Sequence, residues 1–584
     1  MMLQALIAYA EREQLGDADF EPVGVRWLIP LDLHGNMAGG PIPLAENPDA
    51  KKPRPKSFAR PFTSPNELNQ GTKSHFLCDT LERAALFLDP KTAEKAEARR
   101  VQQAYFQKLL EEAATACPAS ASRLESVLSF LRSEVALGQL HRQLIAAKAK
   151  PSDNATFSVD GTNLLDGDDL KDFWRNRRHR LASGAKARQR RICLATGDLG
   201  ETLDTTEKIK GVPGGLATGT NLISFDKDSF CSFGLEQAQN AALCASAELK
   251  IRTALNILIA SGLRIQDAVH LHWTRKRVEQ DPFDLLATAD EKAVATLLKS
   301  IQSGQRPVAF DANAYYALSL SGNGARVVVR DWLESTVPEV ERHVAEWFQD
   351  LGIVPPDGLG VKRDFKFGAL LYGMVRAELA ELPPQIPTQI LHGALRGRSV
   401  PLPQSALAAA LRRQQLDQEN KLNPARLALI KACLIRSQPQ SALNYQQQAP
   451  MNECLNPESR DPAYLCGRLF AVFDRLQYFA LGGVNAGVVE RYYASASVTP
   501  ALVMGRLFRN AQFHLAKAEG GIAENVRKDF ETITCALGDK FKPTLTLEEQ
   551  GRFALGFYHQ KADYRRRTAE RKEAEAKVQS ASSI

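Results

Sequence analysis

The segment Lys208–Gly234 combines lysines, glycines and short polar side chains in a pattern that can bind an anion. Lys208 and Lys210 lie two residues apart and are followed by several glycines around Pro213. Glycine allows positive φ and leaves no side chain in the way, so backbone N–H groups can converge on a phosphate. The run Leu222–Phe225 predicts a short strand that enters a core. A surface hairpin whose glycines only form turns is an equally good interpretation.

Two segments nearer the N-terminus also carry side chains that could contact a nucleic acid. Lys51–Arg60 interleaves prolines with basic residues, which predicts either a basic arm on a phosphate backbone or a solvated loop. Asn69–His75 predicts a polar turn before an apolar helix that starts at Phe76. Its GTKS resembles the end of a P-loop, but position 66 is asparagine where a P-loop requires glycine. We therefore exclude nucleotide hydrolysis.

His270 and His272 lie two residues apart in a predicted strand, which places both imidazoles on one face. The pair could ligate a metal, but a packed or solvated pair is the simpler interpretation. The nine cysteines are scattered without zinc spacing, which favours reduced thiols in a cytosol. Nucleophile elbows, P-loops, dinucleotide fingerprints and zinc clusters are not recognisable. The sequence thus favours a binding protein without catalytic residues, metal or cofactor.

The predicted secondary structure changes along the chain. Strand and helix patterns alternate up to about residue 335, including two strands joined by the turn Ser321–Gly324. Helical patterns such as Pro424–Arg436 and Pro462–Ala480 follow, separated by a linker rich in glutamine and proline. The class predicted is α+β. The predicted divisions are a mixed α/β nucleic-acid-binding region over 1–335, a helical basic region over 336–437, the linker 438–450 and an all-α helical bundle over 451–584.

Composition limits the class of protein. With 584 residues the chain is too long for one ordinary core, and 44% hydrophobic with 24% charged residues is typical of a soluble globular protein. The net charge of +7 permits a polyanionic partner without requiring one. Apolar runs are shorter than the roughly 18 residues that a membrane span needs, and Glu11 and Glu13 are atypical of a signal peptide. We expect a cytoplasmic protein with no membrane partner.

Several segments together resemble the large subunit of the type I-C CRISPR surveillance complex (Cascade). The most characteristic is Lys208–Gly215, KIKGVPGG, followed by LISF, Asp226 and an aromatic run that ends at Gly234. The others occur in order along nearly the whole chain: MLQAL near the start, ALSLSGNGARVVVRDW at Ala317–Trp332, LPQSALAAALRR at Leu402–Arg413 and YLCGRLFAVFDRLQ at Tyr464–Gln477. His75 and Cys78 depart from the family, where relatives carry asparagine and tryptophan.

This resemblance implies a non-catalytic subunit at the 5′-handle end of the CRISPR RNA. Such a subunit recognises the short protospacer-adjacent motif (PAM) on double-stranded target DNA, aids R-loop formation and recruits the helicase-nuclease. Guide pairing then carries sequence recognition, while the protein reads the PAM and the backbone. Further partners implied are the Cascade backbone and small subunits. In relatives, internal translation of the large-subunit gene makes the small subunit, and Met451 is the expected start of such a product.

Two sets of residues are expected to carry the nucleic-acid contacts. The DNA- and PAM-binding set is Asn69, Gln70, Lys73, Ser74, His75, Lys208, Lys210, Gly214, Gly215, Thr218 and Asn221. The backbone-binding set is Lys51, Lys52, Arg54, Lys56, Arg60, Arg396, Arg398, Arg412 and Arg413. Two alternatives stay open: a nucleic-acid-processing enzyme with an unrecognised active site that uses His270 and His272, or a scaffold subunit that contacts only proteins.

Overall fold

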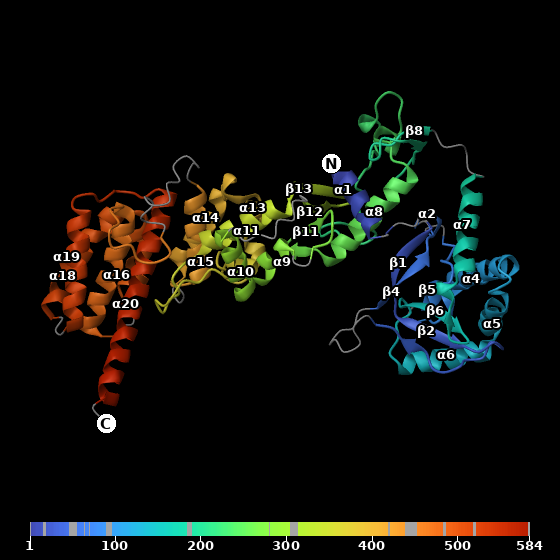
Figure 1. Cartoon of the computed structure of the whole chain (residues 1–584), viewed down its shortest axis with the longest axis horizontal. Helices are drawn as coiled ribbons and strands as arrows, with labels where there is room; N and C mark the ends of the chain where they lie inside the picture. Colours follow the sequence, from blue (N-terminus) through green and yellow to red (C-terminus); the bar gives the residue numbers. More distant parts are fainter. Residues whose placement is uncertain are drawn as a thin grey trace. The chain divides into compact units, whose positions relative to one another are not determined.

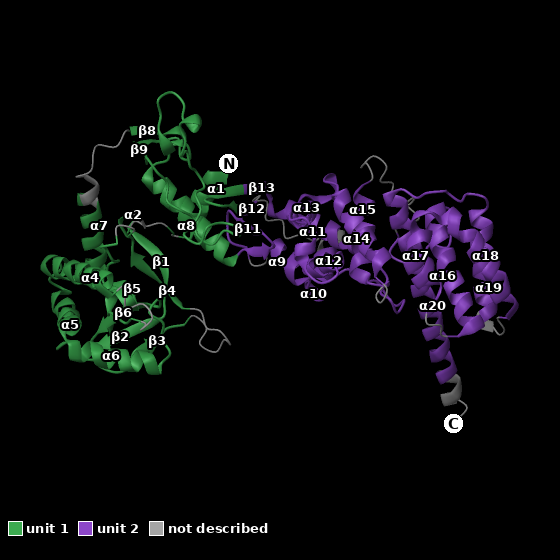
Figure 2. Cartoon of the chain, turned by 180° about the vertical axis from the view of Figure 1, so that it is seen from behind, with its two compact units in different colours: residues 1–261, 322–328 green, residues 262–321, 329–584 purple. Residues whose placement is uncertain are grey.

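The computed structural model describes residues 2–13, 15, 19–45, 55–63, 65–68, 71–88, 96–183, 190–278, 281–303, 313–417, 421–437, 452–482, 486–517 and 521–581. Strands and helices alternate in the first part and helices dominate afterwards, which confirms the α+β class (Figure 1). The chain forms two compact units, Met1–Ser261 with Gly322–Val328, and Gly262–Ser321 with Val329–Ile584 (Figure 2). The predicted division into four parts stays a prediction, and the linker 438–450 lies outside the described residues.

The first unit is built on a mixed sheet. Strand β2 lies between β3 and β6, β6 also pairs with β5 and β7, and the β2–β6 pair is parallel. Trp27, Ile29 and Leu31 are the buried residues of β2, the period-two pattern of a strand on a core. A separate ribbon pairs β1 with β4. The bounds are β1 Phe20–Val25, β2 Trp27–Leu31, β3 Ile42–Pro43, β4 Lys56–Pro61, β5 Cys78–Thr80, β6 Asn154–Val159 and β7 Thr162–Asn163.

Helices complete the first unit. Phe106 of α4 and Phe130 of α5 pack against Phe157 of the sheet, and Trp174 of α7 stacks on Phe76 at a centroid distance of 5.3 Å. Helix α1 packs against α8, and β8 pairs with β9 in a second ribbon. The bounds are α1 Met2–Arg12, α2 Pro65–Leu68, α3 Leu81–Ala84, α4 Ala96–Ala116, α5 Ala121–Arg132, α6 Glu134–Ala146, α7 Asp168–Ser183, β8 Arg190–Ile192, β9 Leu199–Glu201 and α8 Ala245–Ser261.

The second unit begins with an antiparallel sheet in the order β10–β11–β12–β13. The turn between β12 and β13 was predicted, and its tip, Gly322–Val328, groups with the first unit. Trp347, Phe348, Leu427 and Ile430 lie in a helical core beside the sheet. The bounds are β10 Leu263–Ile265, β11 Ala268–Thr274, α9 Pro282–Thr288, α10 Glu291–Ser303, β12 Ala314–Asn323, β13 Arg326–Thr336, α11 Val337–Leu351, α12 Phe367–Tyr372, α13 Gln385–Arg396, α14 Gln404–Leu416 and α15 Pro424–Arg436.

The last five helices of the second unit surround an aromatic core. Phe470 and Phe473 of α16 are buried with Phe553 and Phe557 of α20. The Asp461 side chain accepts a hydrogen bond from the Tyr464 N–H and caps α16, with Pro462 in its first turn. The bounds are α16 Pro462–Leu481, α17 Val488–Val498, α18 Pro500–Lys517, α19 Gly521–Leu537 and α20 Leu547–Ala581. Among the described residues, no helix has the length and apolar character that crossing a bilayer requires.

Two local predictions are wrong. The apolar run from Phe76 is not one helix: it forms a turn, strand β5 and the single-turn helix α3. Cys78 pairs with Thr156 of β6, so a partner far along the chain decides the conformation. Leu222–Phe225 is an irregular, half-buried segment instead of a strand. Only Asn221 forms a bridge there, with Arg326 at the hairpin tip.

Candidate nucleic-acid interface

The glycine-rich segment is closed by a short antiparallel bridge. Ile209 and Thr220 exchange two backbone hydrogen bonds, 2.7 and 2.8 Å long. Ile209 is buried, whereas Lys208 and Lys210 on either side of it are exposed. Because side chains alternate in extended chain, both lysines lie on the same face. The segment therefore presents two ammonium groups together.

The glycines of this segment have an internal packing role. Gly214 has φ +74°, and a Cβ there would lie 2.9 Å from the carbonyl oxygen of Gly322 at the hairpin tip. A Cβ on Gly215 would overlap the Thr220 methyl group. Gly322 donates to the Pro213 carbonyl at 2.6 Å, and the Asn221 N–H donates to the Ala325 carbonyl at 2.7 Å. The absent side chains let two backbones meet inside the first unit.

A cavity of about 490 Å³ brings together three segments that the sequence analysis singled out separately. His75 comes from the polar turn, Arg60 from the basic segment, and Lys208 and Lys210 from the glycine-rich segment. Arg83, which the sequence analysis missed, completes a set of four permanent cations. We call this the basic cavity. Its lining is Glu21, Arg60, Thr63, Leu68, His75, Arg83, Thr205, Thr206, Glu207, Lys208, Lys210, Thr218 and Asn221.

Four residues that line the basic cavity each have a buried polar atom with no hydrogen-bond partner among the described residues. These atoms are Arg60 Nε, Thr63 Oγ1, His75 Nδ1 and Arg83 Nε. The side chains of Arg60, Thr63 and His75 belong to residues only 5–7% exposed. Buried polar groups are normally paired, so four unpaired atoms in residues around one cavity leave hydrogen-bonding capacity there. Guanidinium donors select an acceptor such as a phosphate or carbonyl oxygen.

Charge around the cavity is mostly positive but partly compensated. Glu21 accepts from Arg60, and Asp79 lies 3.5 Å from Arg83. Burial lowers the pKa of His75 well below 6.5, and the charges of Arg60, Arg83 and Lys210 act in the same direction. The imidazole is therefore neutral at neutral pH, so it can donate or accept one hydrogen bond without adding charge.

The remaining residues of the two expected sets in the first unit are placed as follows. Lys73 forms an ion pair with Glu67 at 3.0 Å, and Ser74 is fully buried. Lys56 is exposed, with its ammonium 5.4 Å from the Phe58 ring centroid. Thr218 is exposed and Asn221 half-buried at the cavity. Lys51, Lys52, Arg54, Asn69 and Gln70 lie outside the described residues.

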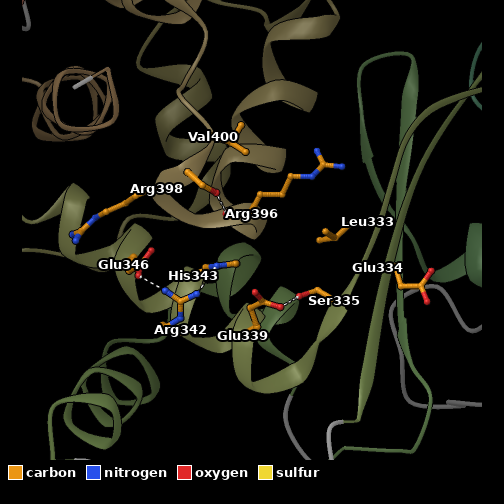
Figure 3. A pocket seen from close by; sticks show the side chains of 11 residues that line it. Leu333, Glu334, Ser335, Glu339, Arg342, His343, Glu346, Arg396, Arg398 and Val400 are labelled. Carbon is orange, nitrogen blue, oxygen red and sulfur yellow. Dashed lines mark hydrogen bonds and ion pairs between the residues drawn. The ribbon is translucent and has the colours of Figure 1, made fainter. Parts of the chain in front are cut away.

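The expected arginines of the second unit lie in a different setting. Arg396 and Arg398 line a cavity of about 540 Å³ together with Glu334, Glu339 and Glu346 (Figure 3). Arg396 donates to Asp331 at 2.6 Å. Arg413 lies 3.3 Å from Asp417, while Arg412 is exposed. The mixed charge of this cavity makes it a weaker attractor for a polyanion than the basic cavity.

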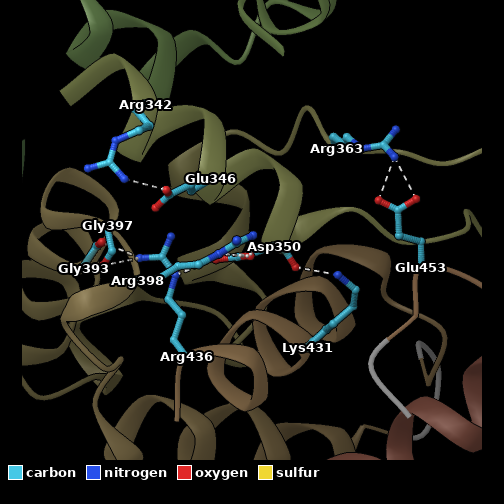
Figure 4. A network of polar contacts seen from close by, with 10 residues as sticks. All are labelled: Arg342, Glu346, Asp350, Arg363, Gly393, Gly397, Arg398, Lys431, Arg436 and Glu453. Atoms are coloured by element: carbon cyan, nitrogen blue, oxygen red, sulfur yellow. Dashed lines mark hydrogen bonds and ion pairs between the residues drawn. The ribbon is translucent and has the colours of Figure 1, made fainter. Parts of the chain in front are cut away.

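Arg398 also belongs to a buried polar network centred on Asp350 (Figure 4). Its guanidinium donates to the Asp350 carboxylate at 2.6 Å, and Arg436 donates to the second carboxylate oxygen at 2.8 Å. Lys431 donates to the Asp350 carbonyl, and burial lowers the pKa of this lysine to about 8. Removing one partner of a buried pair is costly, so Arg398 has a structural task whatever else it binds.

The paired histidines each have internal contacts. Nδ1 of His270 lies 2.8 Å from the Ser319 hydroxyl, and burial lowers the pKa of His270 to about 4. His272 contacts Asp281 at 3.0 Å and stacks on Phe283. Over the described ranges, no cluster of three or more histidine, cysteine, aspartate or glutamate side chains could hold a metal ion.

A serine of β12, an aspartate of β13 and a histidine of α13 also meet beside the β10–β13 sheet. The Ser319 hydroxyl lies 3.4 Å from Nε2 of His392, and Asp331 lies 3.1 Å from the same nitrogen. A catalytic triad needs the aspartate on the other imidazole nitrogen, because the base must be oriented through one nitrogen while the second takes the proton. The arrangement therefore lacks the geometry of a nucleophile relay.

Comparisons with known proteins place the chain in a family. A search of curated proteins finds no match. Residues 6–565 match the family model described as CRISPR-associated protein (Cas_Csd1). The match leaves out only short stretches at the two ends of the 584 residues. The chain therefore belongs to the Cas_Csd1 family of CRISPR-associated proteins.

Proposed function

We propose that this protein is the non-catalytic large subunit of a type I-C CRISPR RNA-guided surveillance complex in the cytoplasm. It binds near the 5′ handle of the CRISPR RNA and recognises the PAM on double-stranded DNA. It then aids R-loop formation and recruits the helicase-nuclease. Its other partners are the backbone and small subunits of Cascade. Family membership and the basic cavity support this assignment.

The basic cavity is the observation that carries the proposal. Arg60, Arg83, Lys208 and Lys210 supply positive charge that attracts any duplex through its phosphates. The neutral His75 and the orphan Thr63 hydroxyl are groups that can distinguish one base edge from another. Charge for affinity and neutral groups for discrimination are the two components that reading a short PAM requires.

Helix α18 is a second surface that fits this function. Its stripe Leu502–Arg506–Arg509–Phe513 lies on one helical face, and all four side chains are exposed. Pro500–Lys517 contains no acidic residue. Within the described residues, neither Arg506 nor Arg509 has an ion-pair partner. Arginines beside an exposed phenylalanine suit a single strand, whose bases stack while its phosphates pair. We assign this α18 stripe to the target or displaced strand.

The test of the proposal compares two lysine pairs in the assembled complex. Lys208→Ala with Lys210→Ala removes charge at the basic cavity. Lys148→Ala with Lys150→Ala removes the same charge, at the same spacing, from exposed positions elsewhere in the first unit. Duplexes with and without the PAM are titrated over a range of salt concentrations. The change at the basic cavity is expected to weaken binding to both duplexes. It should also lower the slope of affinity against salt concentration by about one unit per lost phosphate contact, since counterions are no longer released there.

The control pair is expected to leave both affinity and slope near those of the parent. If both double variants changed duplex affinity and salt slope equally, the proposal that the basic cavity contacts the duplex would be contradicted. Failure of every variant and of the parent to bind nucleic acid in the complex would favour the protein-only scaffold. Cleavage of labelled DNA by the pure chain, lost in His270→Ala, would favour the enzyme.

A further inference from the structure

Two cysteines from distant positions meet at the base of the segment that carries Lys208 and Lys210. Cys193 follows β8 and Cys244 precedes α8. Two backbone hydrogen bonds join the segments there, from the Leu194 N–H to the Ala242 carbonyl and from the Leu203 N–H to the Leu243 carbonyl, 2.8 and 2.9 Å long. All residues between the two cysteines, including both lysines, thus form one loop that starts and ends at this point.

The backbone of Cys244 lies against the sulfur of Cys193. The backbone N–H of Cys244 donates to Sγ of Cys193 at 3.4 Å. With an N–Cα bond of about 1.46 Å, the Cα of Cys244 lies within about 4.9 Å of that sulfur. The Cys244 thiol now contacts the Ser246 hydroxyl at 3.4 Å. A rotation about its Cα–Cβ bond would release this contact and redirect the thiol.

The two thiols are chemically different. Cys193 is 1% exposed, and burial alone would raise its pKa. Hydrogen bonds from the backbone of Cys244, Thr196 and Ala195 and from the Thr196 hydroxyl overcome this effect and lower the pKa to about 7. Cys244 is partly exposed and lines a cavity of about 480 Å³, so small oxidants reach it from solvent. Cys244 is thus the accessible thiol, and Cys193 is a sheltered thiol whose lowered pKa favours the nucleophilic thiolate form.

We propose that Cys193 and Cys244 form a reversible disulfide under peroxide, with Cys244 as the oxidised and Cys193 as the resolving residue. Hydrogen peroxide oxidises the Cys244 thiol to a sulfenic acid and is itself reduced to water. The Cys193 thiolate then attacks the sulfenic sulfur, forms the S–S bond and releases hydroxide. The bond closes the loop that carries the lysines of the basic cavity, and a dithiol reductant opens it again.

The experiment maps thiols on the full-length chain. The protein is treated with hydrogen peroxide, free thiols are alkylated, and non-reduced peptides are identified by mass spectrometry. The result expected is a cross-linked pair of peptides containing Cys193 and Cys244, lost on addition of dithiothreitol. In Cys193→Ser the sulfenic acid on Cys244 persists and is trapped by dimedone, whereas Cys244→Ser leaves Cys193 reduced. Cys454→Ser, which removes an exposed thiol elsewhere, keeps the cross-link.

Two outcomes would overturn the proposal. One is separate alkylation of Cys193 and Cys244 in the wild-type chain at a peroxide dose that oxidises the exposed Cys454 and Cys535. The other is a disulfide that joins Cys244 to Cys231 or to another chain. Both readings come from the wild-type protein, so a variant that folds poorly does not affect them.

Discussion

Gly214 is a residue whose identity the fold itself requires, through two separate effects. Its φ of +74° lies in the left-handed region, where a side chain costs about 1–2 kcal/mol. A Cβ would in addition lie 2.9 Å from the Gly322 carbonyl oxygen. Gly161 at the β6–β7 turn also has φ +74°, but a Cβ there meets no atom within 4 Å. The two positions separate the conformational cost from the packing cost.

We predict that Gly214→Ala opens the contact with the hairpin tip and that Gly161→Ala does not. The alanine at position 214 bears the conformational cost plus a clash of about 1–3 kcal/mol. Hydrogen exchange should therefore accelerate at the Asn221 and Gly322 amides, which bond across this contact. Gly161→Ala should affect only its own turn. Equal protection of Asn221 in both variants would show that the glycine is not needed for packing.

Helix α18 has an exposed face that packing within the bundle does not explain. The buried residues Val503, Met504, Leu507 and Ala511 hold it to the bundle. The α18 stripe faces away from them, with Leu502 81% and Phe513 67% exposed. Helix α20 offers a contrast, because its Arg566 and Arg571 have carboxylate partners on the same helix. Equal losses of charge on the two helices should therefore have different effects.

We predict that Arg506→Ala with Arg509→Ala weakens binding of the complex to an opened, R-loop-forming target. For two lost contacts to a single strand the salt slope should fall by about 1.4 units. Phe513→Ala should lower affinity by about 1–3 kcal/mol without changing the slope, since stacking releases no counterions. Arg566→Ala with Arg571→Ala serves as the control and should be neutral. An equal loss in the control would mean that net charge, and not the stripe, attracts the strand.

Elements with local signals were predictable from the sequence, and elements with distant partners were not. Helix α15 has the predicted bounds because Asn423 caps it and Pro424 lies in its first turn. The helix expected from Phe76 was wrong because Cys78 pairs with Thr156, and the strand expected at Leu222 was wrong because only a single bridge forms beside it.

The candidate site was also only partly predictable, because it depends on contacts between distant segments. Its lysines stand out in the sequence, but Arg83 does not, since its role depends on a cavity formed by segments about 130 residues apart. The pairing of β1 with β4 brings Arg60 beside Glu21, and spacing along the chain cannot reveal such a contact. Residues were thus identifiable by type and segment, while their assembly into one cavity required the fold.

At the scale of the whole molecule, the last five helices are joined to the rest of the second unit by a buried face. Phe470 and Phe553 belong to a separate core whose buried residues all lie between Ala463 and Tyr564. Tyr464 of α16 and Leu555 and Tyr558 of α20 instead belong to the core that includes α14 and α15. The Tyr558 hydroxyl donates to the Val354 carbonyl at 2.7 Å. A polypeptide starting at Met451 would keep its own core but expose this face.

We predict that a product of residues 451–584 is made by internal translation and is present in the native complex, bound so that this face is covered. Met451→Leu in the full gene should abolish the product and leave the large subunit folded. Met374→Leu, at another internal methionine, should leave the product unchanged. Intact mass spectrometry of the purified complex distinguishes these cases.

Burial of apolar surface drives the association of the product with the complex, so Tyr558→Glu should prevent recruitment of the product. A native complex without the product, or one that retains it in Met451→Leu, would contradict internal translation at this codon.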